Sequence, residues 1–407
     1  MFKRAQAESV LYVVGLVGML GTWGRSALDG STALLLRALD GSKPYILPGT
    51  EATLRRNFTG IRYPLDCTLS VLVAFWYEAI DGSHPAASAV SLYFLGQLLP
   101  CIVIAYVNGL RGQKPSLLKY VHHPALMSVD DGCTIGSTGF LWALNYITTS
   151  HTVRPPKQTH LSILQHFSAI SSFAPLVNHL LFPAIVLSYL VPAALMTLPV
   201  ASTISNSSNF HQLAIVAWNI YPLLTLASLY TLRPFLKLIA PAGTTQTTPA
   251  TSKKNEAHIH AIRAATIPAL LFSTLMHIST ASVSITTVLF PTLFQPIYHN
   301  ELHPTAIFIP PLAIGPQAKS PGDGVRGFLL WDQVAGYSTV MIVVMLELRS
   351  AWAAKGWDFR WQRMIPVALG GSLLLGPGSA CLLGSWVRDE VLFGGWGQED
   401  KQVRKVE

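Results

Sequence analysis

Three carboxylic acids, Glu78, Asp81 and Asp332, lie inside or beside long apolar stretches of the sequence. An ionisable side chain is costly inside a membrane, so each is a functional candidate if its stretch crosses one. Glu78 and Asp81 are three residues apart and share one side of a helix that continues to Asp81. The segment Asp81–Pro85, however, has a composition that is equally typical of a turn between two helices. We predict that Asp332, Glu78 and Asp81 are the catalytic groups, with a plain turn as the alternative for Asp81.

Aromatic residues flank these acids in the sequence. Trp76 and Tyr77 precede Glu78, and Trp331 and Tyr337 lie on either side of the third acid. An aromatic pocket withholds water from a carboxylic acid and keeps it protonated, so that it can donate a proton. We predict that these four aromatic residues line the substrate site, where their ring faces would stabilise a cation. An aromatic belt at the membrane surface is the alternative explanation for the tryptophans.

Two polar residues within other apolar stretches, His277 and Asn219, are also predicted to contact the substrate, although hydrogen bonding between neighbouring helices explains them equally well.

His258 and His260 have no carboxylate or thiol close by, and the four cysteines are scattered, so we predict no metal site and no cofactor. Aspartate-rich clusters that hold magnesium on a diphosphate, P-loops and dinucleotide fingerprints are missing. The chemistry is therefore predicted to rely on protonation.

The composition indicates what kind of elements position these residues. Half of the 407 residues are hydrophobic, 12% are charged and the mean hydropathy is +0.41, whereas soluble proteins are about 25% charged. The net charge of +8 is not gathered into basic runs, so no nucleic-acid partner is predicted.

We predict an all-α fold, a polytopic membrane helix bundle that forms one integral membrane domain over residues 1–407. A crossing helix needs about 20 apolar residues, and eight stretches come close: 9–23, 65–80, 90–110, 175–199, 213–232, 264–289, 327–346 and 365–386.

The distribution of basic residues gives an orientation. Lys and Arg gather after the first, third, fifth and seventh stretches and are missing from the loops 81–89 and 200–212. Since cytoplasmic loops collect basic residues, both termini are predicted on the non-cytoplasmic side, most simply of the endoplasmic reticulum membrane. Asp66 and Glu347 fall at the cytoplasmic boundary and are interpreted as interfacial anchors. A cleaved signal peptide is the alternative to an uncleaved first helix.

Two shorter segments complete the predicted organisation. Residues 135–147 are too few and too rich in Gly, Ser and Thr for a crossing helix, and we interpret them as a re-entrant or interfacial segment. Residues 241–255 have the composition of a flexible loop. These segments leave the eight apolar stretches as the elements that must hold the acids.

Several segments resemble fungal membrane-bound terpene cyclases of the ascochlorin and ascofuranone meroterpenoid pathways. They are Arg62–Leu65, Phe75–Pro85, Leu187–Pro192 and Phe328–Gly336, and the resemblance covers most of the chain. It implies a cyclase that needs no metal and acts on a farnesyl chain, usually epoxidised at its end, attached to an aromatic or polyketide-derived head. It also implies that Glu78 and Asp332 match the glutamate and aspartate that manage the proton in smaller meroterpenoid cyclases.

The expected function is therefore that of a membrane-bound terpene cyclase of isomerase or lyase type. Its substrate would be a lipophilic small molecule, and an epoxidase of the same pathway is an expected partner. A proton-coupled small-molecule transporter is the alternative, because kinked helices with a few buried acids suit a carrier. The lack of a visible internal repeat and the position of the acids toward one membrane face argue against it. A lipid-modifying enzyme is a third hypothesis, with His277 as thin support.

Overall fold

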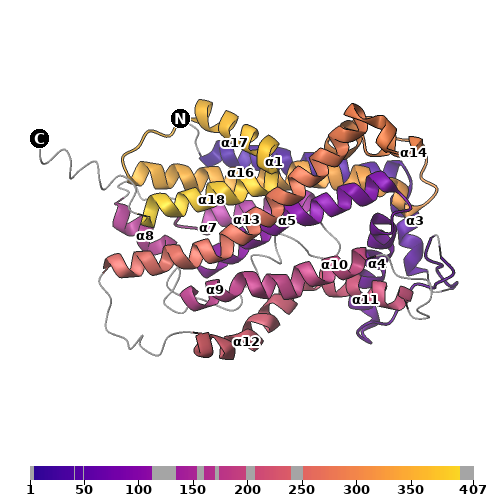
Figure 1. Cartoon of the computed structure of the whole chain (residues 1–407), viewed down its shortest axis with the longest axis horizontal. Helices are drawn as coiled ribbons and strands as arrows, with labels where there is room; N and C mark the ends of the chain where they lie inside the picture. The colour runs from indigo at the N-terminus through magenta and orange to yellow at the C-terminus, as the bar shows by residue number, and fades with distance from the viewer. Residues whose placement is uncertain are drawn as a thin grey trace, which may run out of the picture.

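The computed structural model describes residues 4–40, 42–48, 50–111, 134–153, 160–169, 174–198, 207–239 and 251–394. Within these ranges the regular elements are helices, joined by loops that include one isolated β-bridge between Ile46 and Thr53, which confirms the predicted all-α class. Helices α5 (Pro85–Leu110), α13 (Thr251–Leu289), α16 (Pro321–Ala354) and α18 (Pro377–Phe393) pack side by side along the long axis of the molecule (Figure 1). The helices around them are α1 (Arg4–Met19), α9 (Ala174–Ile185), α10 (Val191–Thr197), α11 (Ser207–Asn219), α12 (Tyr221–Ile239) and α17 (Trp361–Leu375).

Shorter elements connect or extend these helices. Three of them are π-helical turns that continue a neighbouring α-helix: η1 (Leu20–Gly24), η3 (Arg62–Asp66) and η4 (Val186–Leu190). The others are α2 (Arg25–Leu28), α3 (Ser31–Leu36), η2 (Arg37–Leu39), α4 (Cys67–Ile80), α7 (Ile135–Thr149), α8 (Leu161–Ser168), η5 (Pro291–Leu293), α14 (Pro296–Glu301) and α15 (Pro304–Phe308).

Local sequence signals explain where several of these helices begin. Pro85, Pro321 and Pro377 occupy the first position of α5, α16 and α18, where a missing N–H costs no hydrogen bond. Ser320 and Asp323 add a capping box at the start of α16, in which each side chain meets the main chain of the other residue. The start of α16, the helix that carries Asp332, is therefore fixed by its own sequence.

Five helical stretches in the described part of the chain are long and apolar enough to cross a membrane, and a sixth results if a bent pair counts as one. This agrees with the predicted multi-pass helix bundle, although fewer helices than the eight predicted meet the requirement. The five are Ala5–Leu28, Pro85–Leu110, His179–Thr197, Asn255–Leu289 and Pro321–Ala354, and the bent pair is Asn209–Asn219 with Tyr221–Phe235.

The second predicted span, 65–80, is the short helix α4. Its 14 residues measure about 21 Å, less than the hydrocarbon core of about 30 Å. The end of α4 lies where α16 begins, because the Glu78 carboxylate accepts a hydrogen bond from the main-chain N–H of Gly322. The segment before α4 lies at this end too, where the main-chain N–H of Arg55 donates to Gln212 near the start of α11. The prediction is corrected here: α4 does not cross the bundle.

The eighth predicted span, 365–386, is broken at Gly376 into α17 and α18, which pack against each other. Gly376 has φ of 93°, a conformation that favours glycine, and it turns the chain. The turn lies at mid-depth of the bundle, beside Gln97 in the middle of α5. The Gln97 side-chain oxygen accepts from the main-chain N–H groups of Gly378 and Ser379, at 3.1 and 3.4 Å. This stretch is therefore a helical hairpin rather than one crossing helix.

The predicted re-entrant segment, 135–147, forms helix α7, which packs between α1 and α16. It lies along α16 from Asp332, near Gly136, to Glu347, near Tyr146. The helices come close because glycines meet: a Cβ atom at Gly18 of α1 would lie 2.0 Å from the carbonyl oxygen of Gly136. Of the predicted flexible loop 241–255, residues 251–255 belong to α13, which corrects that part, and residues 241–250 lie outside the described ranges.

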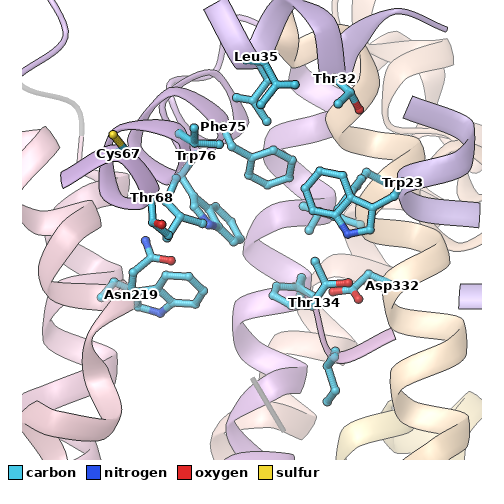
Figure 2. A pocket seen from close by; sticks show the side chains of 18 of the residues that line it. Trp23, Thr32, Leu35, Cys67, Thr68, Phe75, Trp76, Thr134, Asn219 and Asp332 are labelled. Carbon is cyan, nitrogen blue, oxygen red and sulfur yellow. The ribbon is translucent and has the colours of Figure 1, made fainter. Parts of the chain in front are cut away.

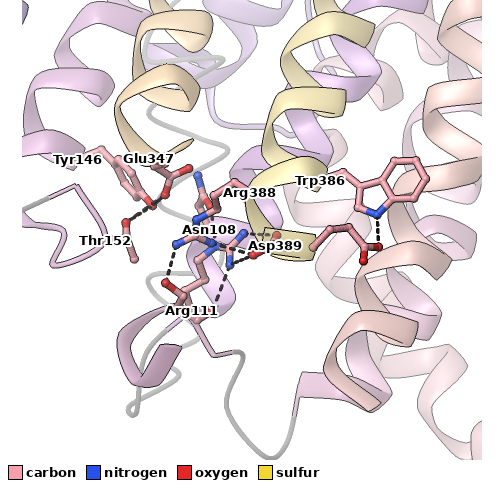
Figure 3. Close-up of polar contacts among 10 residues, drawn as sticks. Asn108, Arg111, Tyr146, Thr152, Glu347, Trp386, Arg388 and Asp389 are labelled. Carbon is pink, nitrogen blue, oxygen red and sulfur yellow. Dashed lines mark hydrogen bonds and ion pairs between the residues drawn. The ribbon is translucent and has the colours of Figure 1, made fainter. Parts of the chain in front are cut away.

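A buried polar network holds the helices together at the end where α16 finishes (Figure 3). Arg111, just after α5, binds both carboxylate oxygens of Asp389 on α18, at 2.9 and 2.8 Å, and Arg388 binds Asp389 at 2.8 Å. Glu347, which we interpreted as an interfacial anchor, is 1% exposed. Its carboxylate accepts from the hydroxyl of Tyr146 at 2.6 Å and from that of Thr152 at 3.0 Å. Glu347 is therefore a buried link between α16 and α7.

The placement of α4 changes the predicted orientation. Helix α1 begins and α18 ends at the same end of the molecule (Figure 1), and Arg111 and Arg388 lie at this end too. The basic segment after α1 lies at the opposite end, where the Arg25 guanidinium donates to the main-chain carbonyl of Pro311 at 3.1 Å. Because α4 does not cross, basic segments that were predicted to share a face lie at opposite ends. The charge alternation that placed both termini on the non-cytoplasmic side therefore no longer holds.

Candidate active site

An apolar cavity of about 520 Å³ opens beside α16 (Figure 2). Cavities of about 300 to 1,000 Å³ enclose drug-sized ligands. Its wall combines elements that are distant in sequence: η1, α3, η3, α4, α5, the start of α7, the junction of α11 and α12, and α16. Polar side chains are few on this wall, and one of them is the carboxyl group of Asp332.

Asp332 is 1% exposed and is held by the first turn of α7. The main-chain N–H of Gly136 donates a 2.6 Å hydrogen bond to Asp332 Oδ1. The Thr134 hydroxyl, at the N-cap of α7, lies beside the same carboxyl group (Figure 2). The first N–H groups of a helix lack partners within it and carry partial positive charge, so this helix end stabilises negative charge on Asp332. A Cβ atom on residue 136 would lie 2.7 Å from Oδ1, so the approach requires glycine.

A row of aromatic rings forms the cavity wall next to Asp332. The rings come from η1, α16, α4 and α11, and neighbouring rings meet mostly edge to face, as aromatic pairs prefer. Ring faces turned to the cavity would attract a cation there. Neighbouring centroids are 5.0 Å apart for Trp23 and Phe328, 5.3 Å for Phe328 and Phe75, 5.6 Å for Phe75 and Trp76, and 4.8 Å for Trp76 and Trp218.

The side of the cavity opposite Asp332 carries Asn219 and Thr68 (Figure 2). Asn219 is the last residue of α11, and α12 begins at Tyr221 after a bend of 80°. The Asn219 side-chain NH₂ group donates to the carbonyl of Ile215, one turn earlier in α11, at 2.8 Å. The bend thus brings a polar side chain to an otherwise apolar wall.

The sequence comparisons place this chain in a family. The model of the CtvD domain matches residues 7–393. The chain belongs to the CtvD family. The chain is similar to terpene cyclase ascI of Acremonium egyptiacum, with 23% identity over 397 residues. These residues cover 95% of this chain and 93% of the relative. Terpene cyclase penA of Penicillium crustosum is 25% identical over 84% of each chain.

The chain is also similar to terpene cyclase ctvD of Aspergillus terreus, 27% identical over 214 residues, which are 52% of this chain and 56% of the relative. No solved structure matches the chain. Membership of the CtvD family confirms the predicted resemblance to fungal terpene cyclases. The cavity thus belongs to a chain whose relatives are named terpene cyclases.

In this CtvD-family chain, the cavity wall includes three of the residues predicted from the sequence: Asp332, Trp76 and Asn219. The other two predicted acids are not among its lining residues. Glu78 is 2% exposed, and its carboxylate caps the start of α16 through the 2.5 Å hydrogen bond from Gly322. Asp81 is exposed, and its carboxylate accepts from the main chain and the hydroxyl of Ser83 at 2.8 and 2.6 Å. Asp81 therefore has the geometry of the plain turn that was its alternative.

Three predicted aromatic residues also lie away from the cavity wall. Tyr77 is buried beside His211, with ring centroids 6.4 Å apart. The Trp331 indole N–H donates to the carbonyl of Pro311 at 3.0 Å. Tyr337 is buried, and its hydroxyl donates to the carbonyl of Phe94 at 3.5 Å. Each of these side chains contacts a neighbouring element instead of the cavity.

His277 is engaged on both ring nitrogens. Its Nε2 lies 3.0 Å from the carbonyl of Leu373, which can only accept, so Nε2 carries the proton. Nδ1 then accepts from the hydroxyl of Tyr93 at 2.9 Å. These contacts match the alternative explanation, hydrogen bonding between neighbouring helices. Within the described ranges, no group of three or more His, Cys, Asp or Glu side chains is arranged to hold a metal ion.

Several lining residues were missed by the sequence analysis. Phe328 is four residues before Asp332 and therefore shares its face of α16, so helical spacing could have found it. Phe75, the first residue of the segment Phe75–Pro85, was not predicted for the site. Trp23 and Thr134 carry no sequence signal that links them to Asp332, because only the packing of α1 and α7 on α16 brings them there.

Proposed function

We propose that this protein is a membrane-bound terpene cyclase in which Asp332 is the acid that starts cyclisation. The observation that carries the proposal is one carboxyl group, buried on the wall of an aromatic cavity that is large enough for a small molecule. The substrate would be an epoxidised farnesyl chain on an aromatic or polyketide-derived head. The reaction keeps all atoms of the substrate, so the enzyme would be an isomerase of fungal meroterpenoid biosynthesis.

The proposed reaction begins with proton transfer from the Asp332 carboxylic acid to the epoxide oxygen. The epoxide C–O bond breaks as the neighbouring double bond attacks the carbon, which forms the first ring and moves the positive charge along the chain. Further double bonds repeat this attack, and loss of a proton to a base ends the cascade. Positioning of each double bond within reach of the cation is the main contribution of the apolar wall.

Two features of the site would support these steps. The N–H of Gly136 and the start of α7 would stabilise the Asp332 carboxylate once the proton has left. The ring faces of Trp76 and Phe328 would stabilise the cation, each by about 2 kcal/mol or more in a site without water. The scarcity of polar groups on the wall would also delay attack by water.

The surface of the bundle supports a membrane location. The residues of α17 include none that are buried, and Val367, Leu369 and Leu373 are 65%, 67% and 77% exposed. Large apolar surfaces of this kind are stable in contact with lipid tails rather than water. We propose a multi-pass protein of the endoplasmic reticulum, where a lipophilic substrate would reach it from an epoxidase of the same pathway.

The proposal is tested with microsomes that contain the full chain and are supplied with an epoxyfarnesyl phenol. The wild-type protein is expected to form a cyclised product of unchanged mass. Asp332→Asn keeps an acceptor for the N–H of Gly136 and removes the acid, so the rate should fall by at least about 100-fold. Asp358→Asn, at an exposed position, is the control.

Retained turnover in Asp332→Asn would reject Asp332 as the acid. Movement of an unchanged solute across the membrane, without any product in the lipid extract, would favour the transporter. The two functions are thus separated by the chemical identity of the recovered molecule.

A further inference from the structure

Two pairs of polar side chains lie on opposite sides of the cavity, and the Thr32 hydroxyl is a further polar group of its wall (Figure 2). Asp332 and Thr134 lie on one side, Asn219 and Thr68 lie on the other, and the aromatic rings lie between them (Figure 2). Asp332 is the carboxylic acid that this wall contains within the described residues. A molecule that fills the cavity therefore meets an acid at one end and neutral hydrogen-bonding groups at the other.

The hydrogen bond of Asn219 fixes which of its atoms remains available. The carbonyl of Ile215 can only accept, so the Asn219 atom 2.8 Å from it is the NH₂ nitrogen. The other side-chain atom, the amide oxygen of Asn219, is suited to accept a hydrogen bond from a ligand hydroxyl. Thr68 adds a hydroxyl that can donate or accept.

The neighbouring rings indicate what would carry this hydroxyl. Thr68, Leu72 and Trp76 are spaced by four residues and share one face of α4, and all three line the cavity. Trp218, next to Asn219, packs against Trp76 with ring centroids 4.8 Å apart. Aromatic surfaces beside hydrogen-bonding groups suit a flat aromatic ring with a polar substituent.

Resting on the proposed function, we infer that Asn219 and Thr68 hold a phenolic head group and thereby direct the epoxide end of the chain to Asp332. The opposite orientation would place the epoxide near Asn219, which has no proton to transfer at ordinary acidity. Asn219 is then a specificity-determining residue, and its amide oxygen accepts the phenol O–H.

The test compares two substrates that differ by one oxygen atom: an epoxyfarnesyl phenol and the epoxyfarnesyl benzene without the hydroxyl. For the wild-type full chain, kcat/KM should favour the phenol by about tenfold, because the benzene leaves the polar groups unpaired. Asn219→Leu and Thr68→Val should each reduce this preference toward about twofold. Thr231→Val, at an exposed position of α12, is the control and should retain the preference.

Comparison of Asn219→Leu with Thr68→Val distinguishes loss of substrate recognition from a structural effect of the substitution. Asn219→Leu also removes the bond to Ile215, whereas Thr68→Val keeps the side-chain shape. Equal losses of kcat/KM on both substrates in both variants would assign a structural role and overturn the inference. A wild-type chain that cyclises both substrates equally well would overturn this inference alone, while a wild-type chain that cyclises neither would overturn the proposed function as well.

Discussion

The main-chain N–H of Gly136 donates a 2.6 Å hydrogen bond to the side-chain oxygen of Asp332, across 196 residues of sequence. This contact joins the start of α7 to a buried position of α16. An acid that has given up its proton becomes an anion, and a helix start is the main-chain structure that best stabilises an anion. The contact therefore matters most after proton transfer, when the charge on Asp332 has no water to stabilise it.

Gly136→Ala tests this contact. The new Cβ atom would lie 2.7 Å from Asp332 Oδ1 and 2.8 Å from the Asp332 carbonyl oxygen, so α7 must move away from α16. The rate of product formation by folded protein should fall by about 10- to 100-fold, because the carboxylate loses a donor. Gly139→Ala on the same helix is the control, since its Cβ meets the side chain of Ile135 at 3.3 Å. Similar rates in the two variants would show that the approach of α7 to Asp332 is not needed.

Glu78→Gln tests whether Glu78, the other buried acid predicted from the sequence, has a catalytic role besides that of Asp332. The glutamine oxygen can still accept from the N–H of Gly322, so the start of α16 stays capped and product formation should stay within about threefold of wild type. Glu78→Leu leaves that N–H without a partner and should lower the free energy of unfolding by about 1 to 3 kcal/mol, with the same product. Product rates and thermal unfolding of the purified protein measure both effects. A folded Glu78→Gln protein without activity would instead make Glu78 the proton donor.

The sequence predicted Asp332 because a charge inside an apolar stretch is rare, but Trp331 and Tyr337, predicted with it on α16, are not among the residues that line the cavity. Residues next to each other on a helix point in different directions, so Trp331 faces away from the cavity that Asp332 lines. Phe328, one turn earlier, shares its face. Trp23 and Thr134 depend on how α1 and α7 pack against α16, and no local pattern encodes that packing.

Two of the predicted spans, 65–80 and 365–386, do not form single crossing helices, for a related reason. Apolar composition shows that a segment avoids water, but not whether it crosses the bundle. α4 is apolar and too short, and α17 and α18 are apolar and turn back at Gly376. The turn is stable because Gln97 supplies an acceptor for two N–H groups at mid-depth, and a buried Gln in α5 has no sequence feature that connects it to residue 378.

Phe328→Leu tests the role of the aromatic wall. Loss of one ring face in a site without water removes about 2 kcal/mol of cation stabilisation, which corresponds to a rate lower by roughly 30-fold. The cation should also survive for a shorter time, so that partly cyclised products containing an added water appear in the extract. Trp331→Phe, which changes an aromatic residue outside the cavity, should keep the wild-type product pattern. Mass spectrometry of the products distinguishes the variants, and an unchanged pattern in Phe328→Leu would argue against a cation beside this ring.

Asp389→Asn tests whether the polar network at the other end of the bundle serves stability rather than catalysis. Asp389 is 1% exposed and balances Arg111 and Arg388 (Figure 3). Removing its charge leaves two buried guanidinium groups uncompensated, which should lower the free energy of unfolding by about 3 to 5 kcal/mol. Asp358→Asn breaks the exposed pair with Arg360, whose side chains are 69% and 57% exposed, and should lower it by less than about 1 kcal/mol.

Thermal unfolding of both purified variants in the same detergent measures this difference, and the products of the folded fraction are analysed in parallel. Because the network lies at the end of α16 away from Asp332, the folded Asp389→Asn protein should form the wild-type product at close to the wild-type rate. Equal shifts in unfolding temperature for the two variants would show that the buried network does not hold the helices together. A changed product pattern would instead mean that the network controls the cavity through α7, which Glu347 and Tyr146 tie to the same end of α16.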